Sequence, residues 1–401
     1  MSYSCHIQTL YAQKSSDDFE ATTTRNDRER GILVLLTVPF AWGTFEPVVR
    51  SVYAIDPPIP GLIFSPCYYF VAASALSLLS FATALSEQDK NDHQDNQDNV
   101  SWLTASLPVL GGIELGFYLF FGNSLQVLGL KTLNSDRVAF LIQLTTIFVP
   151  LVQGLAAGNL FAIPKRTWIA CIIAFCGAGV IGLDGSETAL QDIVITQDIN
   201  MGVSSIVSPQ KLLSQGDYLV VGSALAYTFH CIRLERYAKE TRAVTLAACK
   251  ATTETILSLL LVLALLSYNS DADGSNATSN NFLNSFATET ATEISLFLNT
   301  FPQKLADGSI PNSVLLPAFA AVLWTGLVTC GYTIYAQSYG QSRVNSSTAN
   351  LIYTFQPVWT SLIAYFFLGE TLGPSGFLGG AMIGLAVYLV ISLEQQPEPE
   401  Q

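Results

Sequence analysis

The most constraining feature of this sequence is a long stretch near its C-terminus that is almost free of charge. Between Asp307 and Glu394 the only charged residues are Arg343 and Glu370. They leave three uncharged blocks, at 308–342, 344–369 and 371–393. Each block is long enough to cross a bilayer as a helix, because roughly 20 apolar residues span the hydrocarbon core. A helix at the surface of a water-soluble domain needs a charged outer face, so the sequence predicts a membrane protein.

The composition of the whole chain agrees with this prediction. Charged residues make up 12% and hydrophobic residues 50% of the sequence, whereas about a quarter of an ordinary soluble domain is charged. The net charge of −13 argues against nucleic acid as a partner, because nucleic acid is bound mainly by cations that contact phosphate. The seven cysteines form no CxxC pair and have no histidine cluster beside them. We therefore expect no structural metal, no disulfide framework and no cofactor.

Reading the chain for mostly uncharged runs predicts an all-α integral membrane fold of ten transmembrane helices. Backbone groups in lipid must be satisfied internally, and runs of this length suit helices and not the ten-residue alternating strands of a barrel. The predicted spans are 31–53, 59–85, 103–129, 134–158, 167–184, 216–235, 243–268, 314–340, 345–369 and 371–393.

The loop charges predict an orientation for these spans. If the N-terminus is cytosolic, the segments on that side hold twelve lysines and arginines, against five on the other side. Such a bias places both termini on the cytosolic or stromal side. The sequence leaves the compartment open among plastid envelope, endomembrane and plasma membrane. Outside the spans we expect a disordered tail at 1–30, a polar loop at 185–215, a mobile polar insertion at 269–313 and an acidic tail at 394–401.

The two halves of the chain resemble each other. Gly31 to Trp42 aligns with Gly216 to Tyr227 at an offset of 185. Phe140 to Gly158 aligns with Leu351 to Gly369 at an offset of 211, and the insertion at 269–313 accounts for the difference. Five spans per half is an odd number, so the second copy enters the membrane upside down. Inverted repeats of this kind place a substrate site near the membrane midplane. The predicted repeats are 31–184 and 216–393.

Several motifs resemble those of a known family. The first predicted span contains Ala41-Trp42-Gly43-Thr44. Its second half contains Gly216-Asp217 followed by Ser223 to Tyr227, then Ala349 to Trp359, and then Phe367-Leu-Gly-Glu-Thr-Leu372. This pattern is similar to the EamA family of the drug/metabolite transporter superfamily, in its algal and plant type. The first half departs from the pattern, because Ala157-Gly158-Asn159 stands where Leu-Gly-Glu is expected.

The resemblance implies a ten-helix secondary carrier that moves a small metabolite by alternating access through a central cavity formed by both repeats. Its implied partners are a small-molecule solute and the lipid bilayer, and a homodimer is left open. A phosphate-linked exchanger, of the sugar-phosphate or nucleotide-sugar kind, is an alternative that requires fixed cations against phosphate. A membrane protein without transport activity is another. We do not expect an enzyme, since the sequence contains no HExxH, no GxSxG and no nucleotide-binding loop.

Ionisable residues inside spans are the first candidates for binding solute, because each costs several kcal/mol in lipid unless it faces a partner or water. Glu114 lies near the middle of the third predicted span, and Lys250 and Glu254 lie four residues apart in the seventh. They could line the cavity and bind solute or a coupling proton. Alternatively, Lys250 and Glu254 pair with each other, and Glu114 accepts bonds from a neighbouring helix. His230 is expected to be a hydrogen-bonded residue near the membrane interface.

Aromatic and amide side chains give a second set of candidates. Trp42 and Tyr227 occupy matching places in the two halves, so inverted symmetry would put them on opposite walls of one cavity. A polar and aromatic stripe with three-residue spacing could grip a solute by stacking and hydrogen bonding, or could be an interhelical contact. Its members are Asn350, Tyr353, Gln356 and Trp359.

Prolines and glycines predict where helices kink, turn or approach each other closely. Pro39, Pro150 and Pro357 offer kinks that could open and close a gate. Gly369 and Glu370 form a tight turn with a structural or gating role. Two further glycine pairs predict close helix approach, namely Gly112-x-x-x-Gly116 and Gly380-x-x-x-Gly384.

Overall fold

The structure is a computed structural model, and it is helical in every element that its described residues form. Gly369 and Glu370 lie outside the described residues, as do the tail 394–401 and nearly all of the loop at 185–215. The described residues are 25–45, 48–49, 52, 59–91, 102–130, 133, 135–159, 163–184, 214–272, 282–363, 365–366 and 373–393.

Each predicted span contains helix, and six stretches are long and apolar enough to cross a membrane. These six are Gly61–Ser86, Leu107–Leu130, Val138–Ala156, Ala243–Ser267, Asn312–Gln341 and Pro374–Ser392. The first helix covers residues 25–43 and is followed by α3 (Gly61–Asn91), α4 (Trp102–Leu130), α5 (Ser135–Ile142), α6 (Thr145–Ala156), α7 (Lys165–Asp184), α9 (Gln215–Glu240), α10 (Ala243–Ala272), α11 (Phe282–Ala306), α12 (Asn312–Trp324), the π-helix η3 (Thr325–Tyr332), α13 (Thr333–Gln341), α14 (Ser346–Tyr353), α15 (Gln356–Ile363) and α16 (Pro374–Leu393).

Two predicted spans are broken in the middle. The fourth becomes α5 and α6, which are separated at Gln143 and Leu144, and the ninth becomes α14 and α15, which are separated at Thr354 and Phe355. At both breaks the chain makes a turn in which a backbone N–H donates to the carbonyl oxygen three residues earlier. Gln143 N donates to Phe140 O at 3.0 Å, and Thr354 N donates to Leu351 O at 3.2 Å. Such turns free backbone and side-chain polar groups in the interior of the bundle.

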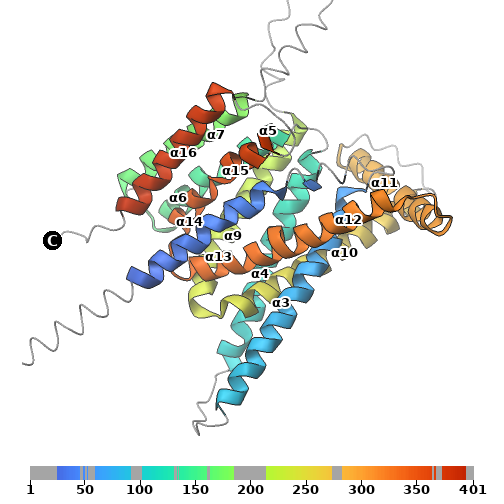
Figure 1. Ribbon diagram of the computed structural model, residues 1–401, viewed down its shortest axis with the longest axis horizontal. Helices are drawn as coiled ribbons and strands as arrows, with labels where there is room; N and C mark the ends of the chain where they lie inside the picture. The colour runs from blue at the N-terminus through green and yellow to red at the C-terminus, as the bar shows by residue number, and fades with distance from the viewer. Residues whose placement is uncertain are drawn as a thin grey trace, which may run out of the picture.

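The helices pack into one bundle in which segments far apart in sequence are neighbours (Figure 1). The helix α16 packs along α7, α9 along α4, and α10 along both α3 and α4. The close approach predicted for Gly112 and Gly116 is confirmed, since a Cβ at Gly116 would lie 2.8 Å from the Lys250 carbonyl oxygen on α10. The approach predicted for Gly380 and Gly384 was wrong, because a Cβ at either would meet only ordinary contacts at 3.8 Å.

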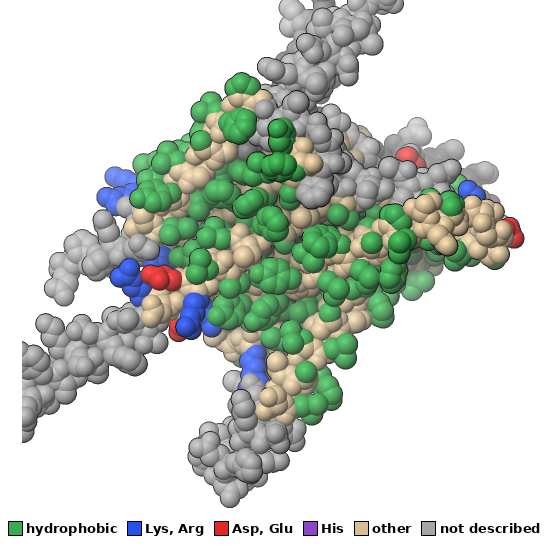
Figure 2. All heavy atoms as spheres, in the orientation of Figure 1, with side chains coloured by type: hydrophobic (Ala, Val, Ile, Leu, Met, Phe, Trp, Pro, Cys, Tyr) green, Lys and Arg blue, Asp and Glu red, His purple; other side chains and the backbone are tan. Residues whose placement is uncertain are grey.

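The outside of the bundle is apolar, as a bilayer requires. Large hydrophobic side chains are exposed on several helices, including Leu316 on α12 at 71% exposed and Phe377 on α16 at 66%. Soluble monomers rarely display extended apolar surfaces of this kind. Figure 2 shows hydrophobic side chains over most of the face in view, with most of the visible lysines and arginines at its left and lower left. The chain is a multi-pass membrane protein.

Two boundaries differ from the prediction. The described part of the first helix includes residues 25–30, which belong to the expected disordered tail. The expected mobile insertion at 269–313 contains an ordered helix, α11, which contacts α10. Its Ala291 and Ile294 are fully buried, so burial of apolar side chains explains why this low-complexity segment folds.

Candidate functional site

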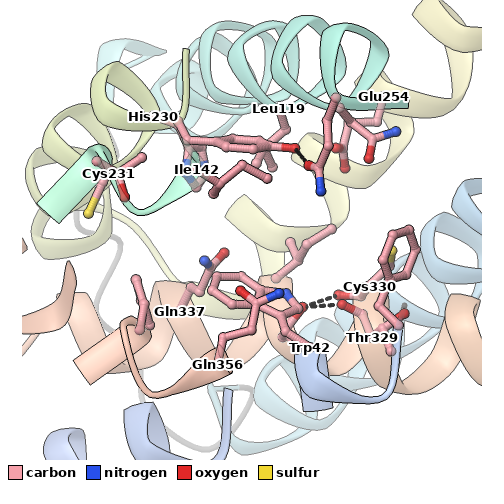
Figure 3. A pocket seen from close by; sticks show the side chains of 18 of the residues that line it. Trp42, Leu119, Ile142, His230, Cys231, Glu254, Thr329, Cys330, Gln337 and Gln356 are labelled. Carbon is pink, nitrogen blue, oxygen red and sulfur yellow. Dashed lines mark hydrogen bonds between the residues drawn. The ribbon is translucent and has the colours of Figure 1, made fainter. Parts of the chain in front are cut away.

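A cavity of about 170 Å³ lies inside the bundle and is lined by both halves of the chain. An engineered cavity of about 150 Å³ is known to hold a benzene molecule, so the space suits a solute of roughly that size. Figure 3 shows Leu119, Ile142, His230 and Glu254 on one side of the hollow and Trp42, Thr329, Gln337 and Gln356 on the other. The full lining is Trp42, Phe45, Tyr68, Tyr69, Leu119, Asn123, Gln126, Ile142, Gln143, Thr145, Tyr227, His230, Cys231, Glu254, Thr329, Cys330, Thr333, Ile334, Gln337, Asn350, Tyr353 and Gln356.

Aromatic rings form much of the cavity wall. Trp42 of the first helix meets Tyr353 of α14 edge-on, with ring centroids 5.1 Å apart. Tyr68 packs against Tyr69 on α3 at 4.5 Å and against Phe45 at 6.2 Å. Edge-on contacts of this kind fix the ring planes relative to each other. The rings therefore offer rigid apolar surfaces on which a small organic solute can stack.

Amide and hydroxyl groups between the rings supply hydrogen-bonding capacity. The Tyr227 hydroxyl donates to Gln126 Oε1 at 2.8 Å, and Asn123 Nδ2 donates to the Tyr68 hydroxyl at 3.3 Å. Asn350 is 6% exposed, and its Nδ2 has no hydrogen-bond partner among the described residues. A buried amide without a partner costs on the order of 1–3 kcal/mol, so this donor is available to a solute in the cavity.

Three ionisable side chains lie at or behind one wall. His230 on α9 and Glu254 on α10 line the cavity and are 3% and 2% exposed. Lys250, one helical turn before Glu254, is fully buried and does not itself line the cavity. Their atoms His230 Nε2, Glu254 Oε2 and Lys250 Nζ all lack a hydrogen-bond partner within the described part of the chain. The predicted pairing of Lys250 with Glu254 is thus not a direct ion pair.

Glu114 lies away from the cavity. Its carboxylate accepts two hydrogen bonds from Arg233 of α9, one from Nε and one from Nη2 at 2.7 Å. It accepts a third from the Tyr237 hydroxyl at 2.6 Å. The side chains of Arg233 and Glu114 are 34% and 28% exposed. Of the two alternatives drawn from the sequence, the structure has the one in which Glu114 accepts bonds from a neighbouring helix and ties α4 to α9.

Six of the nine predicted solute-binding residues line the cavity. Trp359 does not, and it packs instead against Phe40 with centroids 5.1 Å apart. On α15 Trp359 follows Gln356 by three residues, which is about 60° short of a full turn, so the two side chains leave the helix in different directions. The residues on the cavity are Trp42, Tyr227, Glu254, Asn350, Tyr353 and Gln356, and the others are Glu114, Lys250 and Trp359.

The prolines do not sit at the breaks themselves. Pro39 lies within the continuous first helix. Pro150 lies inside α6, past the break at Gln143, and Pro357 occupies the first turn of α15, directly after the break. A proline in the first turn is tolerated because its missing N–H has no partner in the helix anyway.

Several lining residues were missed by the sequence analysis. Asn123, Gln126, Gln143 and Gln337 are amides inside spans, and their polarity in lipid was a usable signal. His230 was expected near the membrane interface, but it lies on the cavity. Thr329, Cys330 and Thr333 gave no signal because they reach the cavity through the π-helix η3 and the turn after it, where the wider backbone re-aims side chains.

The fold and the cavity define a class: a multi-pass helical membrane protein with a solute-sized, partly polar hollow inside its bundle. Residues 278–392 match the EamA-like transporter family. A permease-like protein of Bacillus subtilis (strain 168), YdzE, is 27% identical over 74 residues, which are 18% of this chain and 95% of that protein. The C-terminal part of the chain, at 278–392, is thus similar to the EamA-like transporter family, which agrees with the resemblance of its motifs.

One solved structure shows the same fold over most of the chain. A crystal structure of another protein superposes with a TM-score of 0.57, covering 92% of this chain and 100% of that chain, at 13% identity. At that identity the likeness concerns the fold alone. The match of residues 278–392 to a transporter family is consistent with a transporter of small solutes.

Proposed function

We propose that this protein is a secondary carrier that moves a small neutral or zwitterionic metabolite by alternating access. The central cavity is the solute site, and two inverted repeats of five helices each form it. The observation that carries the proposal is the pairing of lining residues between the two halves.

Eight of the ten lining residues in the first half have a lining counterpart in the second half at one of two constant offsets. These are the offsets of 185 and 211 that align the two halves in sequence. Residues at equivalent places in two repeats meet the same hollow only if the repeats are arranged around it. The pairs are Trp42–Tyr227, Phe45–His230 and Tyr69–Glu254 at 185, and Leu119–Cys330, Asn123–Ile334, Gln126–Gln337, Ile142–Tyr353 and Thr145–Gln356 at 211.

The broken helices give independent support. The turn bonds Gln143 N to Phe140 O and Thr354 N to Leu351 O are equivalent at the offset of 211. So are the bonds from Leu144 N to Leu141 O and from Phe355 N to Ile352 O. Discontinuous helices that face each other at the centre of inverted repeats are typical of carriers that rock around a central site.

The helix contacts also agree with exchange of the two halves. The pairs α3 with α10 and α7 with α16 join equivalent helices. The pair α4 with α10 becomes η3 with α3 on exchange, and both pairs are in contact. The pair α4 with α9 becomes α13 with the first helix, where a Cβ at Gly340 would meet the Leu35 side chain.

The lining chemistry supports a neutral or zwitterionic solute. Among the described lining residues there is no lysine or arginine. A phosphate group requires fixed cations arranged around it, so the sugar-phosphate alternative fits this cavity poorly. Aromatic rings and amides instead suit a small organic solute with a few hydrogen-bonding groups.

Flux into proteoliposomes tests this function. Full-length protein is assayed with radiolabelled amino acids, nucleobases, sugars and triose phosphates. We expect saturable uptake of a neutral or zwitterionic solute, with KM raised at least about tenfold by Gln356→Leu, which removes about 1.4 kcal/mol of binding. Gln303→Leu, at an exposed position on α11, is the matched control and should leave uptake unchanged.

Two outcomes would overturn the proposal. The absence of saturable uptake for every solute would remove the carrier function. Uptake confined to phosphorylated compounds would favour the exchanger alternative. Topology is checked in the same vesicles: we propose both termini on the cytosolic side, and labelling of single cysteines at the two ends should occur from the same face.

A further inference from the structure

The two halves differ in charge at equivalent positions around the cavity. The second half places His230, Lys250 and Glu254 beside the hollow. At the offset of 185, the first half has Phe45, Ser65 and Tyr69 in the same places. The histidine, the lysine and the glutamate of this region therefore all belong to the second half, on the adjoining helices α9 and α10.

Burial of these three ionisable groups inside the bundle costs free energy. Lys250 is 0% exposed, and its Nζ, like Glu254 Oε2 and His230 Nε2, meets no hydrogen-bond partner in the part of the chain that is described. Removing a charge from water costs several kcal/mol unless it is paired and hydrogen-bonded. An apolar residue would fill each position at less cost, as Phe45 does in the first half. Ionisable residues that are kept inside a membrane-spanning bundle despite this cost are typical of proton pathways. The three groups are therefore candidates to bind and release protons.

The neighbouring titratable groups leave this cluster separate from other charges. Glu254 interacts with Lys250 and with the Tyr69 hydroxyl, and Lys250 interacts with His230. On α4, the charged side chain near this level is Glu114, and Arg233 and Tyr237 already bind it. The titratable groups that interact with the cluster are Tyr69 on α3, Cys231 on α9 and Cys330 on η3. The charged residues of the neighbouring α11 include the exposed Glu289 and Lys304.

We propose that Glu254, Lys250 and His230 form a proton-exchanging site that couples solute movement to proton movement. The coupling rests on the proposed carrier function, whereas the exchange of protons does not. Glu254 and His230 contact the cavity, and Lys250 lies behind the wall and interacts with both.

The proton step is simple in its balance. A hydronium ion that reaches the cavity gives its proton to the Glu254 carboxylate, which forms the O–H bond of a carboxylic acid and leaves water. The net charge of the Glu254 and Lys250 pair rises by one, and it falls again when the acid returns its proton to water on the other side. A buried net charge is costly, so the carrier should reorient preferentially in one protonation state.

Infrared difference spectroscopy tests the proton exchange without any solute. Full-length protein in lipid nanodiscs is titrated with acid, and the C=O stretching band of protonated carboxyl groups is followed. We expect a titrating band that is absent in Glu254→Gln and whose midpoint shifts in Lys250→Met. The band should persist in Glu289→Gln, which changes an exposed carboxylate on α11. A spectrum unchanged by Glu254→Gln, or a midpoint unchanged by Lys250→Met, would overturn the site.

Flux separates this inference from the carrier proposal. Proteoliposomes are assayed with radiolabelled L-phenylalanine, uracil and D-glucose, with and without a pH gradient. For a probe that moves, we expect the gradient to speed uptake at least tenfold in the natural protein. Glu254→Gln should lose that acceleration yet retain exchange of labelled for unlabelled probe. Uptake indifferent to the gradient would overturn the coupling while the carrier stands. If no probe moves, the carrier function fails and the infrared titration still decides the proton site.

Discussion

The two halves of this protein place different chemistry at equivalent positions. The first half faces the cavity with Phe45 and Tyr69, and the second with His230 and Glu254. The helix breaks and the spacing of lining residues are alike, so the difference lies in side chains and not in backbone. The two halves can therefore share the backbone arrangement that encloses the cavity, while the histidine and the carboxyl group on the cavity wall come from the second half alone. The predictions below test that contrast.

The largest effect is expected from exchanging the pair Tyr69 and Glu254. Glu254→Tyr copies the first half onto the second and should lower proton-driven solute uptake about 100-fold, or ~2.7 kcal/mol, because the cavity loses its carboxyl group. Adding Tyr69→Glu returns a carboxyl to the equivalent position and should restore at least tenfold. Uptake rates in proteoliposomes measure both. A double variant no better than the single one would mean that the two positions are not equivalent.

The double substitution Lys250→Met with Glu254→Met should have the next largest effect, which is a gain in stability. It removes a buried amine and a buried carboxyl group that each have an atom without a hydrogen-bond partner in the described structure. Replacement of both members of a buried charge pair by apolar residues is often neutral or stabilising by 1–4 kcal/mol, so we expect a gain of about 2 kcal/mol. Thermal unfolding in detergent gives the measurement, with Lys304→Met and Glu289→Met on α11 as the exposed control. A lower midpoint for the double variant of the buried pair would show that the interaction between Lys250 and Glu254 stabilises the fold.

Glu114→Gln should have a smaller effect, which is a loss of stability of the folded protein. The variant leaves Arg233 without its counter-ion, and we expect a loss of about 1 kcal/mol because both side chains are partly exposed. Uptake should stay within about threefold of the natural protein, since Glu114 does not line the cavity. A double-mutant cycle with Arg233→Gln isolates the interaction. Abolished uptake in a well-folded Glu114→Gln protein would return this acid to the solute site.

The smallest effect is expected from Trp359. Trp359→Phe keeps an aromatic ring against Phe40 and should leave KM within about twofold. Trp42→Phe, the matched substitution on the cavity wall, should raise KM about fivefold, or ~1 kcal/mol, because stacking area is lost. Equal effects of the two substitutions on KM would contradict the placement of these tryptophans.

The sequence predicted the helices and much of the site because lipid restricts both. Uncharged runs located helix in every predicted span, and the three-residue stripe placed Asn350, Tyr353 and Gln356 on the cavity. The breaks at Gln143 and Thr354 were not predicted, since neither position carries a glycine or proline and the turn is set by packing. The partner of Glu114 could not be predicted either, because Arg233 stands near the end of the predicted span 216–235 and contacts α4 only through the packing of α9 against it.

The central claim is that the hollow between the halves is a solute site open in turn to each side of the membrane. In a cysteine-free background, Asn350→Cys can be labelled with a membrane-impermeant thiol reagent added to one face or the other. The account predicts labelling from both faces, slowed in each case by a transported solute. Labelling from one face only, under every condition, would contradict it.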